Sequence, residues 1–228
     1  ANVSYDYKKL FFISAVANLS RIKEGLYIDY YTVFPSISAS IDFAKLAVFS
    51  NLNWINELNF YSNIGTSGNY PLNGLANDLY MDIPYTYGGT DYSENPIVRQ
   101  LSNRNLKHES TSEYDFGFKS SFIDKRLTLS GTYFVKNIGD QIIQRDIPYY
   151  FGGGKMLINL GNIKVKGFEM NAEAVPVRNK NLSLIVSGNI SASSQRVTQL
   201  ANGEDIKFYN SDIFFPEFII KEGEPLGN

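Results

Sequence analysis

Few residues in this sequence have the types and spacings that chemistry needs. His108 is the only histidine and the chain contains no cysteine, so the usual zinc ligand sets cannot form. Glu169 and Glu173 lie four residues apart. On one face of a strand that spacing is about 13 Å, which exceeds the roughly 5–9.5 Å between the carboxyl groups of a glycosidase. Neither a metal centre nor a catalytic carboxylate pair is predicted.

Two further chemical signals are weak. The stretch FGGGKM (151–156) is rich in glycine, but it lacks the Gly-Lys-Ser/Thr ending and the following helix of a phosphate loop, which favours an external loop. Ser36, Ser38 and Ser40 have no His or Asp evidently arranged to activate a hydroxyl group. We therefore expect no catalytic residue, no cofactor and no metal, and a protein that is not an enzyme.

Three tyrosines in one long connection are the candidate contact residues. Tyr85, Tyr87 and Tyr92 lie in the segment 66–108, which is rich in Gly, Pro, Asn and Tyr and is much longer than usual connections. Their rings could stack on sugar rings or pack beneath a partner protein. Packing of the connection on itself is at least as good an interpretation.

The elements that position these residues have the alternation of β-strands. Residues 112–137, SEYDFGFKSSFIDKRLTLSGTYFVKN, alternate apolar and polar side chains, break at Ile-Asp-Lys-Arg and then alternate again, which predicts a hairpin. Only Phe134 interrupts the polar face. The apolar face carries Tyr114, Phe116, Phe118, Phe122, Leu127, Leu129, Tyr133 and Val135.

Other stretches repeat this pattern. Residues 33–43, 168–174 and 182–192 alternate regularly, whereas 3–19 and 54–64 alternate less regularly. Together with the hairpin they give about seven strands and no convincing amphipathic helix. The predicted class is all-β.

Alternation alone fits either one sheet of a soluble sandwich or a barrel wall with lipid outside and water inside. The connections favour the barrel, because outer-membrane barrels have short periplasmic turns and long external loops. Short links alternate with long ones, except for a short link at 20–27, and a helical turn is possible near 44–51. The short links lie near 45–53, 123–126 and 176–181, and the long ones at 66–108, at 144–157 and beyond 196.

Composition narrows the class further. Aromatic residues make up 14% of the 228 residues and charged residues 19%, which is below the roughly 25% of average soluble domains. No apolar run is long enough for a transmembrane helix, so any membrane crossing must use strands. The net charge of −2 and the scattered basic residues argue against nucleic acid. Candidates for aromatic girdles at the lipid headgroups are Trp54, Tyr61, Tyr133, Tyr149 and Tyr150.

Five stretches, in matching order and spacing, resemble the C-terminal barrel of the SusC/RagA-like TonB-dependent outer-membrane transporters of Bacteroidetes. They are FPSISAS (34–40), IGTSGN (64–69), NRNLKHESTSEYDFGF (103–118), NLGNIKVKGFEM (159–170) and KEGEPLGN (221–228). The family's Asn-x-Asn-Leu-Lys-x-Glu motif falls on Asn103, Asn105, Leu106, Lys107 and Glu109. Its Gly-x-Ile-x-x-x-Gly-Phe-Glu motif falls on Gly161, Ile163, Gly167, Phe168 and Glu169.

The resemblance implies an antiparallel transmembrane β-barrel in the bacterial outer membrane. Residues 1–228 are then part of the wall of a barrel of about 22 strands, with the plug domain and the TonB-binding segment outside this chain. The implied function is import of glycans or peptides. The implied partners are a SusD-like surface lipoprotein, TonB and outer-membrane lipid.

Two departures from the family pattern leave alternatives open. Residues 17–25 lack the Arg-Asp-Gly-Ser segment usual after the corresponding strand, and Arg104 and His108 stand where Pro and Trp are common. A SusC-like barrel that acts as a structural or scaffold subunit of an outer-membrane assembly is the second hypothesis. A soluble carbohydrate-binding β-sandwich is the third.

Overall fold

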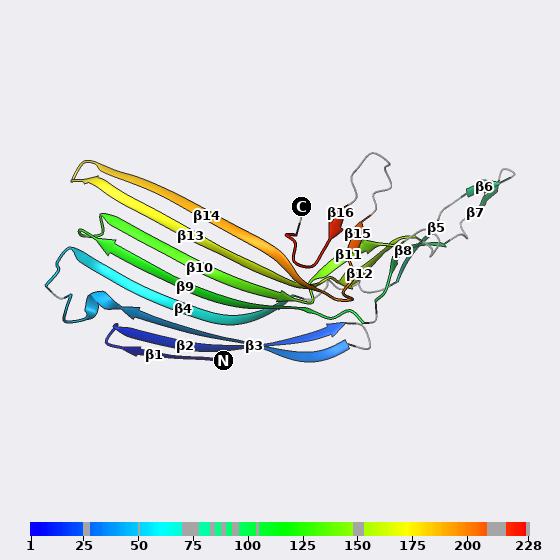
Figure 1. The fold of residues 1–228 in the computed structure, drawn as a ribbon, viewed down its shortest axis with the longest axis horizontal. Coiled ribbons are helices and arrows are strands. Elements are labelled where there is room, and N and C mark those ends of the chain that lie inside the picture. Colours follow the sequence, from blue (N-terminus) through cyan, green and yellow to red (C-terminus); the bar gives the residue numbers. More distant parts are fainter. Residues whose placement is uncertain are drawn as a thin grey trace. The chain divides into compact units, whose positions relative to one another are not determined.

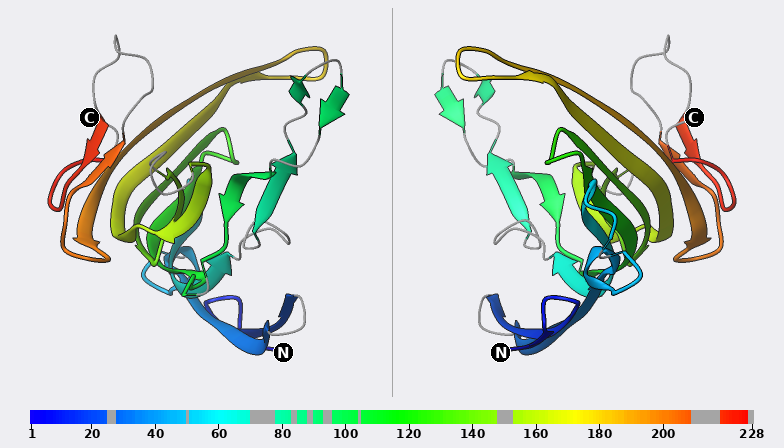
Figure 2. Two further views of the ribbon diagram at one scale, coloured as in Figure 1. Left: turned by 90° about the vertical axis from the view of Figure 1, so that its right-hand side faces the viewer. Right: turned by 90° about the vertical axis from the view of Figure 1, so that its left-hand side faces the viewer.

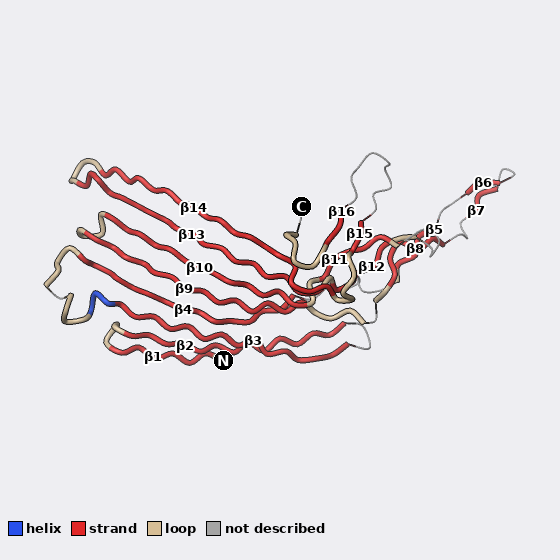
Figure 3. The backbone as a smooth tube through the Cα atoms, viewed as in Figure 1, coloured by secondary structure: helices blue, strands red, loops and turns tan. Residues whose placement is uncertain are grey.

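The chain is built almost entirely of β-strands (Figures 1 and 3). The only helical element in the described part is the short 3-10 helix η1 (Phe43–Lys45), which confirms the helical turn expected near 44–51. No helix in that part is long and apolar enough to cross a membrane. The computed structural model describes residues 1–24, 28–49, 51–69, 78–82, 85–87, 90–92, 96–103, 105–147, 153–208 and 218–226.

Eight strands form the main sheet, each beside the preceding strand of the sheet. Seven of them have 13 to 18 residues, well above the roughly 9–11 residues that a tilted strand needs to cross a bilayer. In order they are β1 (Asn2–Tyr7), β2 (Phe11–Glu24), β3 (Ile28–Asp42), β4 (Ile55–Asn69), β9 (Glu109–Phe122), β10 (Leu127–Gly139), β13 (Gly161–Arg178) and β14 (Ser183–Leu200).

The long connections contain smaller sheets, which the sequence interpretation treated as loops. One sheet has the order β11–β12–β8–β5, in which only β12 and β8 pair in parallel. Two more sheets are hairpins, β15–β16 and β6–β7. The bounds are β5 (Leu79–Asp82), β6 (Tyr85–Tyr87), β7 (Thr90–Tyr92), β8 (Pro96–Leu101), β11 (Ile142–Asp146), β12 (Lys155–Asn159), β15 (Ile206–Phe208) and β16 (Phe218–Ile220).

The chain divides into two compact units, and the division separates short turns from long connections. The first, here called the wall unit, comprises Ala1–Ser67, Thr111–Asn137 and Lys164–Gln195. It holds most of each main-sheet strand and the turns that close β1–β2, β3–β4, β9–β10 and β13–β14. The second, here called the loop unit, comprises Gly68–Ser110, Ile138–Ile163 and Arg196–Asn228 and holds the long connections.

The single strand expected over 3–19 is wrong, because β1 and β2 are two strands joined by a tight turn. Lys8 and Lys9 have φ angles of 54° and 56°, and the amide of Leu10 donates to the carbonyl of Tyr7 at 2.9 Å. Tyr7 pairs directly with Phe11. Three turn residues leave the odd–even pattern unchanged, so the apolar alternation continues through the turn and hides it.

The register gives the sheet of the wall unit one apolar and one polar face. Tyr5 pairs with Ile13, and Ile13 pairs with Ala39, so these side chains share the apolar face. Ser14 and Asn63 each pair with Ser38 on the polar face. Successive strands follow one another along a curved sheet in the wall unit (Figure 2). In the described part of this unit, Val175 is the only buried hydrophobic side chain.

Three aromatic rings in the wall unit each lie over a glycine of the next strand of the sheet. A Cβ added at Gly117 would overlap the Tyr61 ring, and Gly131 and Gly167 leave room in the same way for Phe118 and Phe134. Glycine in a strand permits this close approach. Phe134 therefore interrupts the polar face because its ring covers the bare backbone at Gly167.

The prediction that Tyr61 belongs to an aromatic girdle is wrong. The Tyr61 hydroxyl is 2.7 Å from Thr132 Oγ1, and the backbone of Tyr61 pairs with Ser40, so Tyr61 lies on the polar face. Trp54 and Tyr133 are exposed, and Trp54 stacks on the ring of Phe122 at 5.7 Å. A girdle role for these two remains a prediction, and Tyr149 and Tyr150 lie outside the described residues.

Candidate functional sites: a polar groove and a loop clamp

The three predicted contact tyrosines belong to the hairpin β6–β7 in the loop unit. The backbone pairs Tyr85 with Tyr92 and Tyr87 with Thr90. The side chain of Tyr87 is 76% exposed, so it is available to a ligand or a protein. The side chains of Tyr85 and Tyr92 lie outside the described part. Their role as contact residues stays a prediction.

A groove of about 240 Å³ lies on the wall unit between β3, β4 and β9. Hydroxyl, amide and carboxylate groups line it and can donate to or accept from a polar solute. Glu113 is held at its edge by Lys136, whose Nζ is 2.9 Å from the Glu113 carboxylate. The lining residues on the polar face are Ser36, Ser38, Asn63, Gly65, Ser67, Glu113 and Asp115, and Ile37, Ile64 and Thr66 complete the lining. The alternation of residues 33–43 places Ser36 and Ser38 on one face of a strand, but it did not predict the groove.

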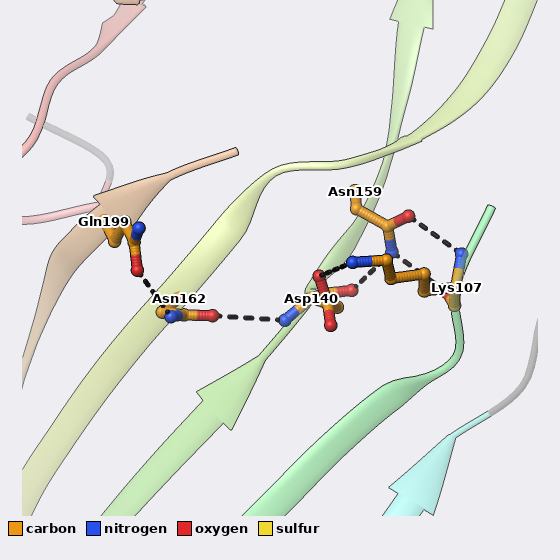
Figure 4. Close-up of polar contacts among 5 residues, drawn as sticks. All are labelled: Lys107, Asp140, Asn159, Asn162 and Gln199. Carbon is orange, nitrogen blue, oxygen red and sulfur yellow. Dashed lines mark hydrogen bonds and ion pairs between the residues drawn. The ribbon is translucent and has the colours of Figure 1, made fainter. Parts of the chain in front are cut away.

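In the loop unit, polar side chains bind backbone groups of segments far apart in the sequence (Figure 4). Asn159 Oδ1 accepts the amide of Lys107 at 2.9 Å. Its Nδ2 donates to the carbonyls of Lys107 and Asp140 at 2.9 and 2.7 Å. The Lys107 ammonium lies 4.0 Å from the Asp140 carboxylate. One amide side chain thus ties the end of β12 to the segment before β9 and to the residue after β10.

Glu109 extends these contacts to β4 and β11. Its side chain is buried, and Oε1 accepts the amide of Ile142 at 2.7 Å while Oε2 accepts Asn69 Nδ2 at 2.8 Å. Hydrogen bonds to a charged acceptor contribute about 1.5–3 kcal/mol each. Asn103 adds another connection, since its Nδ2 donates to the carbonyl of Leu157 at 3.0 Å.

The contacts continue to β14 through Asn162. Its Oδ1 accepts the amide of Asp140 at 3.4 Å, and its Nδ2 donates to Gln199 Oε1 at 3.1 Å. Beside it, Gly161 has φ of 131°, and a Cβ there would overlap the backbone carbonyl of Gln199. We name the set Asn103, Lys107, Glu109, Asp140, Asn159, Asn162 and Gln199 the loop clamp.

The loop clamp indicates that several residues of the two family motifs have a structural role and not a catalytic one. Of the motif residues, Asn103, Lys107 and Glu109 bind backbone or side-chain partners, and Gly161 allows close approach of two chain segments. The motifs identified these positions without showing their contacts. Asp140 and Gln199 stand in no motif and were missed, because only the folded chain brings them together.

The remaining chemical candidates are not gathered into one site. Glu169 and Glu173 are exposed on β13, whereas the sole histidine is in the loop unit. Part of the FGGGKM stretch, 151–152, lies outside the described residues. In the described part of the chain, no group of three or more His, Asp and Glu side chains is placed to hold a metal ion.

The geometry agrees with relatives of known type. The family described as "TonB dependent receptor-like, beta-barrel" matches residues 1–221. TonB-dependent receptor P3 of Formosa agariphila is 23% identical over 99% of this chain and 23% of its own length. TonB-dependent receptor SusC of Bacteroides thetaiotaomicron is 24% identical over 77% of this chain and 18% of its own length. The chain thus spans less than a quarter of these relatives.

Solved structures show the same fold. The structure of the RagAB peptide transporter matches with a TM-score of 0.78 and 20% identity, covering 97% of this chain and 24% of the other. The RagAB peptide importer in its "closed-closed" state matches with a TM-score of 0.75 at 20% identity, again over 97% and 24%. The soluble-sandwich hypothesis is therefore wrong. The chain belongs to the TonB-dependent receptor-like β-barrel family, as a SusC-like piece of an antiparallel barrel in the bacterial outer membrane.

Proposed function

We propose that this chain is part of the wall of an importer that takes up glycans or peptides together with a SusD-like surface lipoprotein. TonB would drive transport through a segment of the protein outside this chain. The observation that carries the proposal is the two-faced wall unit of a SusC-like barrel, in which polar groups line one face and apolar groups the other. The protein is a transporter in this proposal and not an enzyme.

The polar groove supports this role because it offers weak, replaceable contacts. Hydroxyl and amide groups such as those of Ser36, Ser38 and Asn63 can exchange hydrogen bonds with water, sugars or peptide groups at little net cost. Carboxylates at Glu113 and Asp115 add acceptors for sugar hydroxyls or peptide amides. A wall of this kind holds a polar solute in passage without trapping it.

The β6–β7 hairpin is the proposed contact with the lipoprotein or the substrate. Exposed tyrosine rings provide apolar area with a hydrogen-bonding hydroxyl, which suits both sugar stacking and protein interfaces. Tyr87 is the residue to test first, because its side chain is exposed. Tyr85 and Tyr92 complete the proposed contact.

The second hypothesis, a scaffold subunit, keeps the barrel but drops the transport. It is favoured by residues 17–25, which depart from the family sequence. β2 and β3 nevertheless pair regularly as far as Glu24 and Ile28, so the departure from the family sequence does not interrupt the pairing of these strands. The two hypotheses differ in whether a solute crosses the membrane.

Uptake in cells distinguishes them. Cells that carry the full-length gene, with and without a functional TonB, are supplied with a panel of labelled oligosaccharides and peptides. An importer accumulates at least one class, and loss of TonB abolishes that accumulation. The proposed partner is tested by co-purification. A surface lipoprotein should co-purify with the wild-type protein, and less of it should co-purify with Tyr87→Ala. A barrel that assembles, binds neighbours and takes up nothing in the panel is a scaffold.

A further inference from the structure

The four short turns of the wall unit form one continuous edge. Each turn is hydrogen-bonded to an adjacent turn or to the strand end beside it, so their side chains are presented side by side. The bonds run from Asp42 N to the Leu10 carbonyl (2.9 Å), from Ile123 N to the Trp54 carbonyl (2.8 Å) and from Arg178 Nη1 to the Asp124 carbonyl (3.3 Å).

This edge is basic, although the whole chain carries a net charge of −2. Seven cations here outnumber three carboxylates, and two of those, Asp6 and Asp42, already accept backbone amides. None of the seven cations has an ion pair among the described residues. We name them the basic rim: Lys8, Lys9, Lys45, Lys125, Arg126, Arg178 and Lys180.

Exposed apolar side chains stand between these cations. Val48, Ile123 and Leu182 are 82%, 56% and 58% exposed, one in each of three turns that also carry a basic residue. The Trp54 ring, stacked on Phe122, lies at the same end of the strands. A soluble anion would need the cations alone. Cations interleaved with apolar groups suit the boundary between headgroups and acyl chains.

We propose that the basic rim binds the phosphates of anionic phospholipids in the periplasmic leaflet of the outer membrane. Short turns of outer-membrane barrels lie on the periplasmic side. The apolar face of the strands ends at the turns that carry the basic rim. Lipids whose acyl chains cover this face therefore have their headgroups at the level of the turns. Lys and Arg next to an anionic membrane surface each strengthen attraction to it. The rim thus anchors the turn ends at the headgroups.

Lipid preference of the full-length protein tests the proposal. The protein is reconstituted in nanodiscs of phosphatidylcholine and phosphatidylglycerol, and native mass spectrometry measures which lipid it retains. The double variant Lys125→Gln/Lys180→Gln is compared with Lys155→Gln/Lys221→Gln, which removes the same charge from exposed positions in the loop unit. Each rim cation removed should lower the preference for phosphatidylglycerol about fivefold, so the double variant should lower it roughly 25-fold. The control should retain the preference.

Other outcomes of the lipid-preference experiment either contradict or support lipid binding by the basic rim. Equal loss in both double variants means that net charge alone sets the preference, which overturns the proposal. So does a wild-type protein with no preference for the anionic lipid, or a rim variant that keeps the preference and instead loses binding to isolated cell-wall polymer. Lys125→Arg/Lys180→Arg should retain the wild-type preference, and heat-modifiable migration confirms that every variant is folded.

Discussion

In the wall unit large apolar side chains stay exposed along one face, whereas the loop unit has a small buried core and paired polar groups beside it. Tyr5, Ile37 and Ile64 of the wall unit are each more than half exposed. Leu160 and Val197 of the loop unit are completely buried. Among the described residues of the wall unit only Val175 is a buried hydrophobic side chain, so the stability of this unit depends on the surrounding lipid. The loop unit depends on the loop clamp and a small core of its own.

This difference implies that the same kind of substitution has different effects in the two units. In the loop unit, a change at the clamp breaks contacts between distant segments and leaves buried polar groups unpaired. In the wall unit, the effect of a change depends on the face it alters and on what medium that face meets. Matched substitutions within each unit test this difference.

The largest effect is expected in the loop unit at Gly161. Gly161→Ala would place a Cβ against the Gln199 carbonyl at a φ of 131°, where a side chain is strained in any case. We expect a loss of roughly 3 kcal/mol or more. Gly203→Ala is the control, since its φ of 69° is also left-handed but no atom lies within 4 Å. It should cost only about 1–2 kcal/mol. Urea-induced unfolding of the full-length protein followed by tyrosine and tryptophan fluorescence measures both.

A somewhat smaller effect is expected for the buried carboxylate of the clamp. Glu109→Ala removes the acceptor of the Ile142 amide and of Asn69 Nδ2 and should cost about 2–3 kcal/mol locally. Hydrogen exchange at the Ile142 amide should accelerate by roughly 30- to 150-fold. Glu109→Gln keeps one carbonyl oxygen as an acceptor and should lose less. Unchanged exchange in Glu109→Ala would show that the clamp does not hold β11 in place.

In the wall unit, packing of a ring over a glycine should produce an intermediate effect. A Cβ at Gly117 would meet the Tyr61 ring and lie 2.8 Å from the Gly131 carbonyl oxygen, so Gly117→Ala should cost about 1–3 kcal/mol. Tyr61→Phe keeps the ring and removes only the hydroxyl bonded to Thr132, at a cost of about 1 kcal/mol. Folding midpoints in lipid vesicles rank the two. Equal midpoints would mean that the ring does not lie over Gly117.

A turn between two strands is readable from the sequence when it shifts the apolar positions between even and odd residue numbers, as the β9–β10 turn does. The four residues between Phe122 and Leu127 shift the apolar positions from even to odd, so the turn was visible. The three residues between Tyr7 and Phe11 leave the apolar positions odd on both sides, so this turn was missed. Local patterns therefore specify faces better than they specify strand number.

The candidate sites were harder to predict, because their residues come together only through long-range pairing. Asn159 and Lys107 are 52 positions apart in sequence, and the groove combines residues of β3, β4 and β9. The motif positions of the clamp were recognisable as a family pattern, but no local rule indicates which backbone groups they bind. Tyr61 was a candidate for an aromatic girdle because tyrosine is common at lipid headgroups, yet its hydroxyl contacts Thr132 on the polar face.

The most direct test of the wall unit compares adjacent positions on β10 that face opposite sides. Leu129 shares its face with Gly131, against which the Phe118 ring packs, and Ser130 shares its face with Thr132, the partner of Tyr61. Arg at either position has the same strand propensity, so the difference between variants reports the surrounding medium.

The measurement is the free energy of unfolding and the folded yield of the full-length protein, assayed by heat-modifiable migration, for Leu129→Arg and Ser130→Arg. If the apolar face meets lipid, Leu129→Arg should cost about 2–4 kcal/mol near the bilayer midplane. Ser130→Arg should cost well under 1 kcal/mol, since its side chain enters water. Equal damage from both substitutions, or no damage from either, would contradict the lipid-facing assignment of the wall unit.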